Sequence, residues 1–336
     1  MEQNKKLAEL LLQWFDKSGR DLPWRHKGGA HPNPYVILVS EFMLQQTTVK
    51  TVIPYFYRFM QKFPTINDLA AATEEEVYKM WEGLGYYTRA RSLHKTAQMI
   101  VSEYGGNFPT AKEDVLKLKG IGPYTVASFL ALAFNQPETV VDGNVSRIIC
   151  RMYHLTEPLD KLKITIRELA EKLTNRKRAA DYASAIMDLG AVICTPKNPQ
   201  CLLCPWQEYC QSKSTEELEQ IPLKIKTAKP EKQGKVYLIY NDKNEIMIYK
   251  KTEKGLLSGL YSFPWSEEEL YPEAEDTGLT VTHVFTHFKL TLRIYHLKNL
   301  MSIPSGYFYI SPQKLSEYPF SILMQKVIRK AIKNPR

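Results

Sequence analysis

Four of the five cysteines fall within one short segment and could share a single metal centre. Cys194, Cys201, Cys204 and Cys210 follow the spacing C-x6-C-x2-C-x5-C, whereas Cys150 stands apart. Four thiolates from one compact loop can bind an iron–sulfur cluster or a zinc ion. Structural zinc sites usually present two close cysteine pairs, and only Cys201 and Cys204 form one. The spacing therefore favours a 4Fe-4S cluster and leaves zinc as the alternative, while the odd cysteine total disfavours disulfides.

Two carboxylates stand in sequence surroundings that would give them opposite protonation states. Glu41 lies in an otherwise apolar stretch, residues 36–44, where desolvation would raise its pKa and keep it protonated. Asp142 precedes a predicted helix, where an N-cap position would keep the carboxylate ionised. One neutral acid and one charged acid could together cleave a glycosidic bond through a cation-like transition state. The alternatives are an ion pair between Glu41 and a distant arginine, and a purely structural cap at Asp142.

A glycine-containing turn between two predicted helices could bind a phosphate group. Residues 116–125 read Leu-Lys-Leu-Lys-Gly-Ile-Gly-Pro-Tyr-Thr, with Gly120 and Gly122 in the turn. Glycine lets the backbone approach a ligand closely, and the amides that open the next helix can hold an anion. An ordinary tight turn between helices would explain the same pattern.

The periodicity around these residues predicts a multidomain protein. A chain of 336 residues with 44% hydrophobic content can form two or three packed units. Apolar side chains recur at intervals of three and four from about residue 5 to 213, which predicts an all-α domain. We place this domain at residues 1–214, with a six-helix part over about 26–132 and a cluster part formed by 1–25 and 133–214. The polar, lysine-rich segment 215–234 is then a linker.

After the linker the hydrophobic period becomes two, which predicts strands. Residues 235–240 and 245–249 read as a hairpin around the turn 241–244, and residues 288–294 alternate again. A last helix is expected over 321–333. The second domain, residues 235–336, should therefore be a smaller α+β domain with a mostly antiparallel sheet.

The net charge of +9 favours an anionic partner, although many basic proteins bind no nucleic acid. No N-terminal segment has the pattern of a secretion signal, and the longest apolar run, about residues 125–134, is too short to cross a bilayer. We therefore expect a cytoplasmic protein without membrane contact.

Taken together, these motifs coincide with those of a known family. The chain resembles the adenine DNA glycosylases, the MutY family of the helix-hairpin-helix superfamily, over nearly its whole length. The motifs that carry the resemblance are Leu22-Pro-Trp-Arg25, Ser40-Glu-Phe-Met-Leu-Gln-Gln-Thr47, Gly83-Leu-Gly-Tyr-Tyr87, the hairpin at Gly120 to Thr125, Val141-Asp-Gly-Asn144 and the cysteine spacing.

The resemblance implies a substrate and a mechanism. The cysteines would hold a 4Fe-4S cluster, and a monomeric enzyme would bind duplex DNA with adenine opposite 8-oxoguanine or guanine and flip the adenine into a pocket. Glu41 would protonate N7 of the adenine, and Asp142 would stabilise the oxocarbenium ion or trap it briefly, assisted by Tyr124 and Asn144. Endonuclease III has a lysine at the position of Tyr124, and a phenol cannot form the Schiff base that cuts the strand. The resemblance therefore implies a monofunctional DNA repair glycosylase, associated with a bacterial-type nucleoid.

The same resemblance assigns contacts to DNA within the helical domain. Arg25 would lie against the adenine, and Gly120 and Gly122 would form the DNA-binding hairpin. A wedge would prop open the duplex beside the oxidised guanine. Its residues are Gln46, Thr47, Leu84 and Tyr86, of which Leu84 and Tyr86 should be the bulky tips of an exposed turn unless they pack in the core.

The C-terminal domain resembles the MutT-like, or Nudix-like, domain that recognises 8-oxoguanine in this family. The resemblance rests on residues 255–264 and on the loop in which Phe285, Thr286 and His287 would contact the lesion. Residues 266–278 lack the arginine and the paired glutamates of a Nudix metal site, so we expect no nucleotide hydrolysis.

Three positions depart from the family pattern. The segment from His26 to Asn33 is a few residues longer than usual, Thr286 replaces a serine, and Ser184 replaces a Gln or Glu that contacts the adenine in relatives. Two further classes of function stay open from the residues alone. One is a bifunctional lyase of the endonuclease III type, and the other is a non-enzymatic iron–sulfur DNA-binding protein; the cysteines alone would also allow an electron carrier or a zinc protein.

Overall fold

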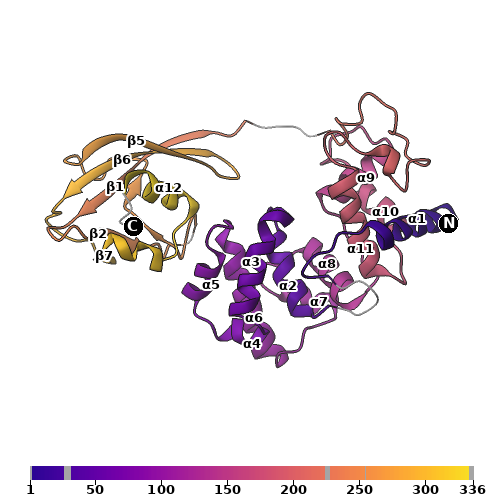
Figure 1. Ribbon diagram of the computed structural model, residues 1–336, viewed down its shortest axis with the longest axis horizontal. Coiled ribbons are helices and arrows are strands. Elements are labelled where there is room, and N and C mark those ends of the chain that lie inside the picture. Colours follow the sequence, from indigo (N-terminus) through magenta and orange to yellow (C-terminus); the bar gives the residue numbers. More distant parts are fainter. Residues whose placement is uncertain (1, 26–31, 224–227, 254, 333–336) are drawn as a thin grey trace. The chain divides into compact units, whose positions relative to one another are not determined.

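The computed structural model describes residues 2–25, 32–223, 228–253 and 255–332, and the chain divides into two compact units. The first unit comprises Met1–Ala71 and Ser92–Lys226, and the second comprises Ala72–Arg91 and Thr227–Arg336. Described elements of the first unit are helical, and the second combines one sheet with helices (Figure 1). The predicted fold class, an all-α domain followed by an α+β domain, is confirmed.

One group of helices in the first unit surrounds the N-terminal helix and leads into the cysteine segment. The apolar face of α1 is buried at Leu7 and Leu11, where it joins a core shared with Ile149 and Leu173. The last helix of the group continues without a break into the π-helical turn Leu189–Ile193, and Cys194 follows directly. The helices are α1 (Glu2–Ser18), α9 (Gly143–Met152), α10 (Lys163–Leu173) and α11 (Ala179–Asp188).

A second group of helices in this unit contains the helical hairpin. Two of its helices are apolar on nearly all sides, so they are buried against each other and against neighbours. One of these, α8, also packs on α11 and so joins the two groups. The helices are α2 (Pro34–Leu44), α3 (Val49–Lys62), α4 (Ile66–Ala71), α7 (Lys112–Lys117) and α8 (Pro123–Phe134), while α6 (Tyr87–Tyr104) enters from the second unit.

The second unit is built on a single seven-stranded sheet. Its order is β3-β2-β1-β6-β5, with β4 also paired to β1 and β7 to β2. The predicted hairpin is present, because Tyr240 pairs with Ile246 across the turn. Between the strands that the structure describes, the ladder of β1 with β6 is parallel and the others are antiparallel. The strands are β1 (Glu231–Tyr240), β2 (Ile246–Lys250), β3 (Tyr261–Ser262), β4 (Trp265–Ser266), β5 (Glu275–Val284), β6 (Lys289–Lys298) and β7 (Tyr307–Ile310).

The C-terminal helix covers one face of this sheet next to β5. It is α12 (Ile322–Ala331), which lies within the predicted range 321–333, and Ser321 caps it by accepting a hydrogen bond from the Met324 amide. Leu323, Met324 and Val327 point into a core that includes Leu292 of β6. The edge strand β5 and this helix are therefore fixed to each other.

The observed unit boundaries differ from the predicted ones at two places. Strand β1 begins at Glu231, inside the predicted linker, because residues 231–234 pair with 289–292 of β6 although their side chains are mostly polar. The segment Ala72–Arg91, with α5 (Glu74–Trp81), belongs to the second unit. It is held there by hydrogen bonds such as Gln325 Nε2 to Glu82 Oε1 at 2.8 Å and the Tyr87 hydroxyl to the Phe320 carbonyl at 3.1 Å. Polar contacts of this kind leave no hydrophobic period in the sequence.

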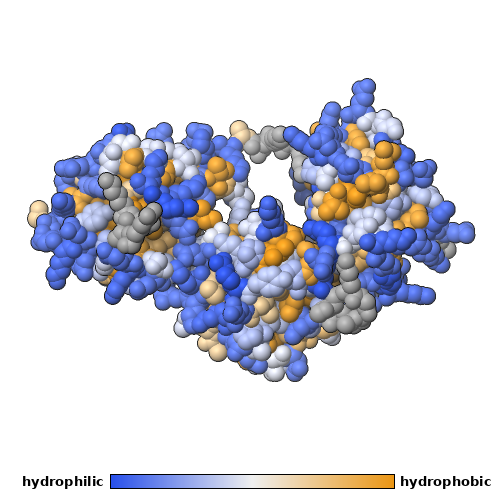
Figure 2. Space-filling view, viewed as in Figure 1, coloured by the Kyte–Doolittle hydropathy of each residue, from blue (hydrophilic) through white to orange (hydrophobic). Residues whose placement is uncertain are grey.

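Among the residues that the structure describes, none of the helices combines the length and the apolar character that a membrane span requires. The visible face of the molecule is mostly hydrophilic, with apolar residues in scattered patches (Figure 2).

Candidate active site

Glu41 is a buried acid whose pKa is raised to near neutrality. It lies on α2, only 6% exposed, and the Ser128 hydroxyl of α8 donates a hydrogen bond of 2.5 Å to its Oε2. Burial raises the pKa of Glu41 to about 7; the nearby Asp142 charge raises it further, while the Ser128 hydrogen bond and the Arg25 charge oppose the rise. The predicted rise in the Glu41 pKa agrees with this buried environment. The hydrogen bond to Glu41 comes from a neutral hydroxyl group, that of Ser128.

Asp142 is the N-cap of α9, as its position in the sequence indicates. Its Oδ1 accepts a hydrogen bond of 2.7 Å from the Val145 amide, and its Oδ2 accepts one of 2.9 Å from Asn144 Nδ2. Both donors fix the position of the carboxylate at the start of α9. The capping role and a negatively charged active-site role are therefore compatible in one residue.

Tyr124 lies in the first turn of α8, where both acids act electrostatically on its phenol. Burial raises the pKa of its phenol, and the charges of Glu41 and Asp142 raise it further, so Tyr124 stays neutral. Its hydroxyl lies 3.8 Å from the Met187 sulfur. The structure thus brings Glu41, Tyr124, Asp142 and Asn144 together from three helices.

Arg25 is fixed beside this group by a buried carboxylate. Its guanidinium Nη1 lies 2.8 Å from Oδ2 of Asp188, which is fully buried at the end of α11 and also binds Arg20 at 2.6 Å. Burial alone would raise the pKa of Asp188, but the two arginines hold it below its usual value. Residues 26–31 of the extended segment from His26 to Asn33 lie outside the described residues.

Two residues of the site were not singled out in the sequence, namely Ser128 and Asp188. Ser128 stands in the apolar run of α8 and Asp188 at the end of α11, so a polar residue within a buried helix is the signal that could have found them. Ser184, the departure from the family pattern, is likewise buried in α11.

The helical hairpin is formed as predicted. Gly120 has φ of 74°, and a Cβ there would lie 2.4 Å from the Ser92 Cβ, so this position requires glycine. Gly122 is the N-cap of α8 and has no side chain to accept hydrogen bonds from the first amides of the helix. A Cβ at Gly122 would meet no other atom within 4 Å, so the space beside the start of α8 is open.

The four residues assigned to a wedge differ in exposure. Gln46 is exposed with φ of 58°, and Thr47 follows it half-buried in the turn after α2. In the second unit, Tyr86 is 47% exposed, with φ of 49°, and the Arg89 guanidinium lies over its ring. Leu84 is only 6% exposed, so the expectation of an exposed tip is wrong for Leu84, which packs in the interior. The turn points only one bulky side chain, Tyr86, outward.

The loop assigned to the lesion is the tip of the β5–β6 hairpin. The Phe285 amide donates to the Phe288 carbonyl at 2.8 Å, and their rings lie 4.8 Å apart, which closes the loop. Thr286 and His287 are exposed between them. Two polar side chains are therefore exposed at the tip of a loop that an aromatic pair closes.

The cysteine quartet lines one cavity in the first unit, and Arg151, Ile193 and Lys213 are also part of its wall. Four thiolates gather negative charge on one centre, and the cations Arg151 and Lys213 in the cavity wall offset it.

Buried arginines tie the cysteine loop to α9. Arg151 donates to the Thr195 carbonyl at 2.6 Å and lies 3.5 Å from the Cys194 sulfur. Arg147 donates from Nε to the Cys194 carbonyl at 2.8 Å and from Nη2 to Asn144 Oδ1 at 2.9 Å. The loop is therefore linked by hydrogen bonds to the start of the helix that Asp142 caps.

Three models of protein families match successive parts of the chain. Residues 39–176 match the HhH-GPD superfamily of base excision DNA repair proteins, and residues 194–210 match the iron–sulfur binding domain of endonuclease III. Residues 235–330 match the NUDIX domain. The second match covers the first and the last cysteine of the quartet and decides for an iron–sulfur cluster over zinc.

Curated relatives match over most of the chain. The adenine DNA glycosylase of Homo sapiens is 31% identical over 95% of this chain and 72% of its own length. The chain belongs to the adenine DNA glycosylase family. The adenine DNA glycosylase of Buchnera aphidicola subsp. Acyrthosiphon pisum is 34% identical over 84% of both chains.

This family member also resembles a solved structure in its helical part. A thermostable thymine-DNA glycosylase matches 63% of this chain and 99% of its own with 30% identity and a TM-score of 0.56. The chain is accordingly a base excision repair glycosylase that acts on DNA and carries an iron–sulfur cluster. The alternatives of a non-enzymatic DNA-binding protein, an electron carrier and a zinc protein are excluded.

The raised pKa of Glu41 predicts a pH-dependent stability effect. The folded state favours the neutral acid, so the stability that this preference contributes is present below about pH 4.5 and is lost as the pH rises through about 7. Glu41→Gln removes the titration. The unfolding free energy of the variant minus that of the unchanged protein should therefore rise by about 3 kcal/mol between pH 4.5 and pH 8, since one pKa unit is about 1.4 kcal/mol. Denaturant unfolding of both proteins at both pH values measures this, and a pH-independent difference would contradict a buried neutral Glu41.

Proposed function

We propose that this glycosylase hydrolyses the N-glycosidic bond of adenine that lies opposite 8-oxoguanine or guanine in duplex DNA. The observation that carries the proposal is the pair of acids. Burial raises the pKa of Glu41 to about 7, so a large share of this acid keeps its proton at neutral pH, and the Asp142 carboxylate is held by two hydrogen-bond donors. A proton donor beside a fixed negative charge suits a departing base and a cationic sugar.

The reaction follows from these positions. The adenine leaves the base stack and enters the site, where Glu41 donates its proton to N7. Protonation draws the electrons of the C1′–N9 bond onto the base, and the sugar becomes an oxocarbenium ion that Asp142 stabilises. A water molecule then adds at C1′ and loses a proton, which leaves an abasic site and free adenine. Arg25, fixed by Asp188, and the neutral phenol of Tyr124 border the base and the sugar.

The reaction ends at hydrolysis because the site has a tyrosine where a lyase needs an amine. Tyr124 stands at the start of α8 beside both acids, and its phenol cannot form an imine with the opened sugar. The DNA strand therefore remains intact until another activity cuts it. The iron–sulfur cluster, when bound, holds the cysteine loop in shape and supplies no step of the hydrolysis.

The preference for 8-oxoguanine is assigned to the exposed hairpin tip at Thr286 and His287. Polar side chains at the tip of the loop that Phe285 and Phe288 close can donate to the extra carbonyl, or accept from the extra N–H, that oxidation gives guanine. His287→Ala should lower adenine release opposite 8-oxoguanine by about tenfold and leave release opposite guanine nearly unchanged, since one hydrogen bond is worth about 1 kcal/mol or slightly more. Single-turnover assays on the two duplexes measure the ratio.

Lys243→Ala provides the matched control for this experiment. Lys243 is exposed in the β1–β2 turn, and the parallel register of β1 and β6 puts that turn at the opposite end of the sheet. Its removal should leave the ratio unchanged. An equal loss on both duplexes for His287→Ala would remove the lesion contact from the proposal.

A further inference from the structure

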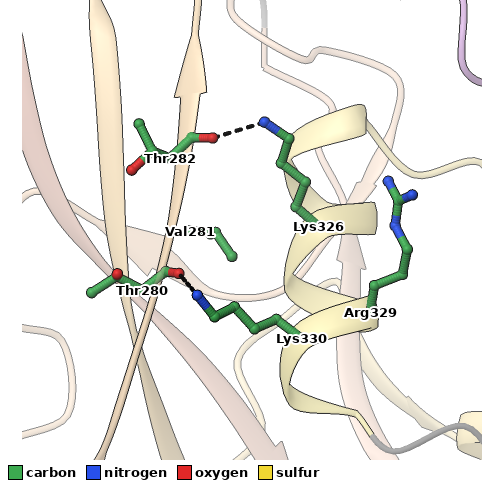
Figure 3. A pocket seen from close by; sticks show the side chains of 6 residues that line it. All are labelled: Thr280, Val281, Thr282, Lys326, Arg329 and Lys330. Atoms are coloured by element: carbon green, nitrogen blue, oxygen red, sulfur yellow. Dashed lines mark hydrogen bonds between the residues drawn. The ribbon is translucent and has the colours of Figure 1, made fainter.

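A cationic groove lies on the second unit between the edge strand β5 and helix α12. It has a volume of about 430 Å³ and is lined by Thr280, Val281, Thr282, Lys326, Arg329 and Lys330. Figure 3 shows the two lysines reaching from the helix toward the strand, while Arg329 extends from the same helix. The lining has three positive charges and no carboxylate, so it is built for an anion.

The two lysines of the groove are held in place by the edge strand. Lys326 Nζ donates to the Thr282 carbonyl at 2.8 Å, and Lys330 Nζ donates to the Thr280 carbonyl at 2.7 Å. Each ammonium group carries three N–H donors and uses one of them in this way. The remaining donors can bind phosphate oxygens, and less side-chain entropy is lost because the lysines are already ordered.

The groove lies close to the lesion loop along the same strand. Thr282 is three residues before Phe285, a separation of about 10 Å in an extended chain. Three nucleotide steps of a duplex also span about 10 Å of helix axis. His283 lies between them: its ring is 4.7 Å from that of Phe285, and burial, with the Lys326 charge adding to it, lowers its pKa. The positive field of the groove therefore extends toward the loop.

We propose that Lys326, Arg329 and Lys330 bind the DNA backbone within about three nucleotides of a lesion held at the Phe285–Phe288 loop. This inference rests on the proposed function for the position of the lesion, and it adds an anchor on the second unit. Phosphate contacts would fix the register of the duplex, while the loop reads the base. Each phosphate that a cation neutralises releases counterions, so binding should become less dependent on salt when the cations are removed.

The structural alternative is that the lysines only protect an edge strand, a common use of lysine. Lys326→Gln with Lys330→Gln separates the two roles, because glutamine keeps a polar side chain with N–H donors beside the strand but carries no charge. The control is Lys243→Gln with Lys298→Gln, which removes two exposed lysines at the other end of the sheet. A Lys326→Arg and Lys330→Arg variant keeps the charges.

The test measures affinity of the full chain for a duplex with 8-oxoguanine opposite a 2′-fluorinated adenosine, which resists cleavage, over a series of salt concentrations. The glutamine pair should lower the slope of log affinity against log salt by between about 1 and 2, because each phosphate that is no longer neutralised lowers it by about 0.9. The control pair and the arginine pair should keep the slope of the unchanged protein. Replacing single phosphates near the lesion by neutral methylphosphonates should weaken the unchanged protein and not the glutamine pair.

The groove inference would be overturned if the glutamine pair kept the slope and the affinity of the unchanged protein while thermal unfolding showed it to be folded. That result would point to edge protection or to an acidic protein partner. That result would leave the proposed function intact if adenine were still released from an unmodified substrate. Loss of adenine release by the unchanged protein, in contrast, would remove the proposed function itself.

Discussion

Replacing Glu41 with Gln should lower the single-turnover rate of adenine release by about 10²–10⁴-fold, the contribution that general acid catalysis usually makes. The amide has the size of the acid and can still bond to the Ser128 hydroxyl, so the packing between α2 and α8 is kept. It cannot transfer a proton to adenine N7. Rates measured with excess enzyme over a lesion duplex separate this chemical step from product release.

The pH dependence of the unchanged enzyme gives an independent reading of the same group. Because the protonated form is active and its pKa is about 7, the rate should fall as the pH rises above 7. Ser128→Ala removes a hydrogen bond that lowers the Glu41 pKa, so the fall should move to higher pH. A Glu41→Gln enzyme that kept the full rate would show that another group supplies the proton.

Replacing Asp142 with Asn should lower the rate by about 10²–10³-fold, the usual cost of removing one electrostatic interaction with a transition state. Asparagine caps helices about as well as aspartate, so α9 should still begin at Gly143 and the melting temperature should stay close to that of the unchanged protein. The substitution removes the negative charge opposite the oxocarbenium ion. Single-turnover release and thermal unfolding, measured on the same preparation, separate the two roles.

Asp160→Asn is the matched control for this substitution. Asp160 is an exposed carboxylate of the same unit, paired at the surface with Lys163, and its loss changes the net charge by the same amount. The control should keep its rate. Full activity in Asp142→Asn would contradict a role for its charge, and a rate loss accompanied by a large loss of stability would show that the substitution disturbs the fold.

The sequence predicts the local environments of the two acids because each depends on neighbouring residues in the chain. The apolar stretch around Glu41 becomes the buried helix α2, and the position of Asp142 before a helix becomes an N-cap. Their partners depend on packing between distant segments. Ser128 lies 87 residues from Glu41, and Asp188 lies 163 residues from Arg25, so no local pattern joins them.

Prediction from the sequence has a similar limit in the second unit. Alternation predicts β1, β2 and β6 as strands, but the parallel pairing of β1 with β6 depends on which strands meet, and period two carries no such information. The segment 72–91 joins this unit through side chains such as Glu82 and Tyr87, whose partners follow 233 or more residues later. The glycines around Leu84 predict a turn with an exposed tip, but a turn does not determine which side chain faces inward.

The enzyme should release adenine by hydrolysis, and the base opposite the adenine should determine whether release occurs. The measurement is free adenine from duplexes with adenine opposite 8-oxoguanine, guanine or thymine, under single-turnover conditions and with Glu41→Gln alongside, together with strand integrity before and after alkali. We predict release opposite 8-oxoguanine and guanine, little opposite thymine, and strand breaks only after alkali. Release no greater than that of Glu41→Gln on every duplex, or strand cleavage without alkali, would contradict the account.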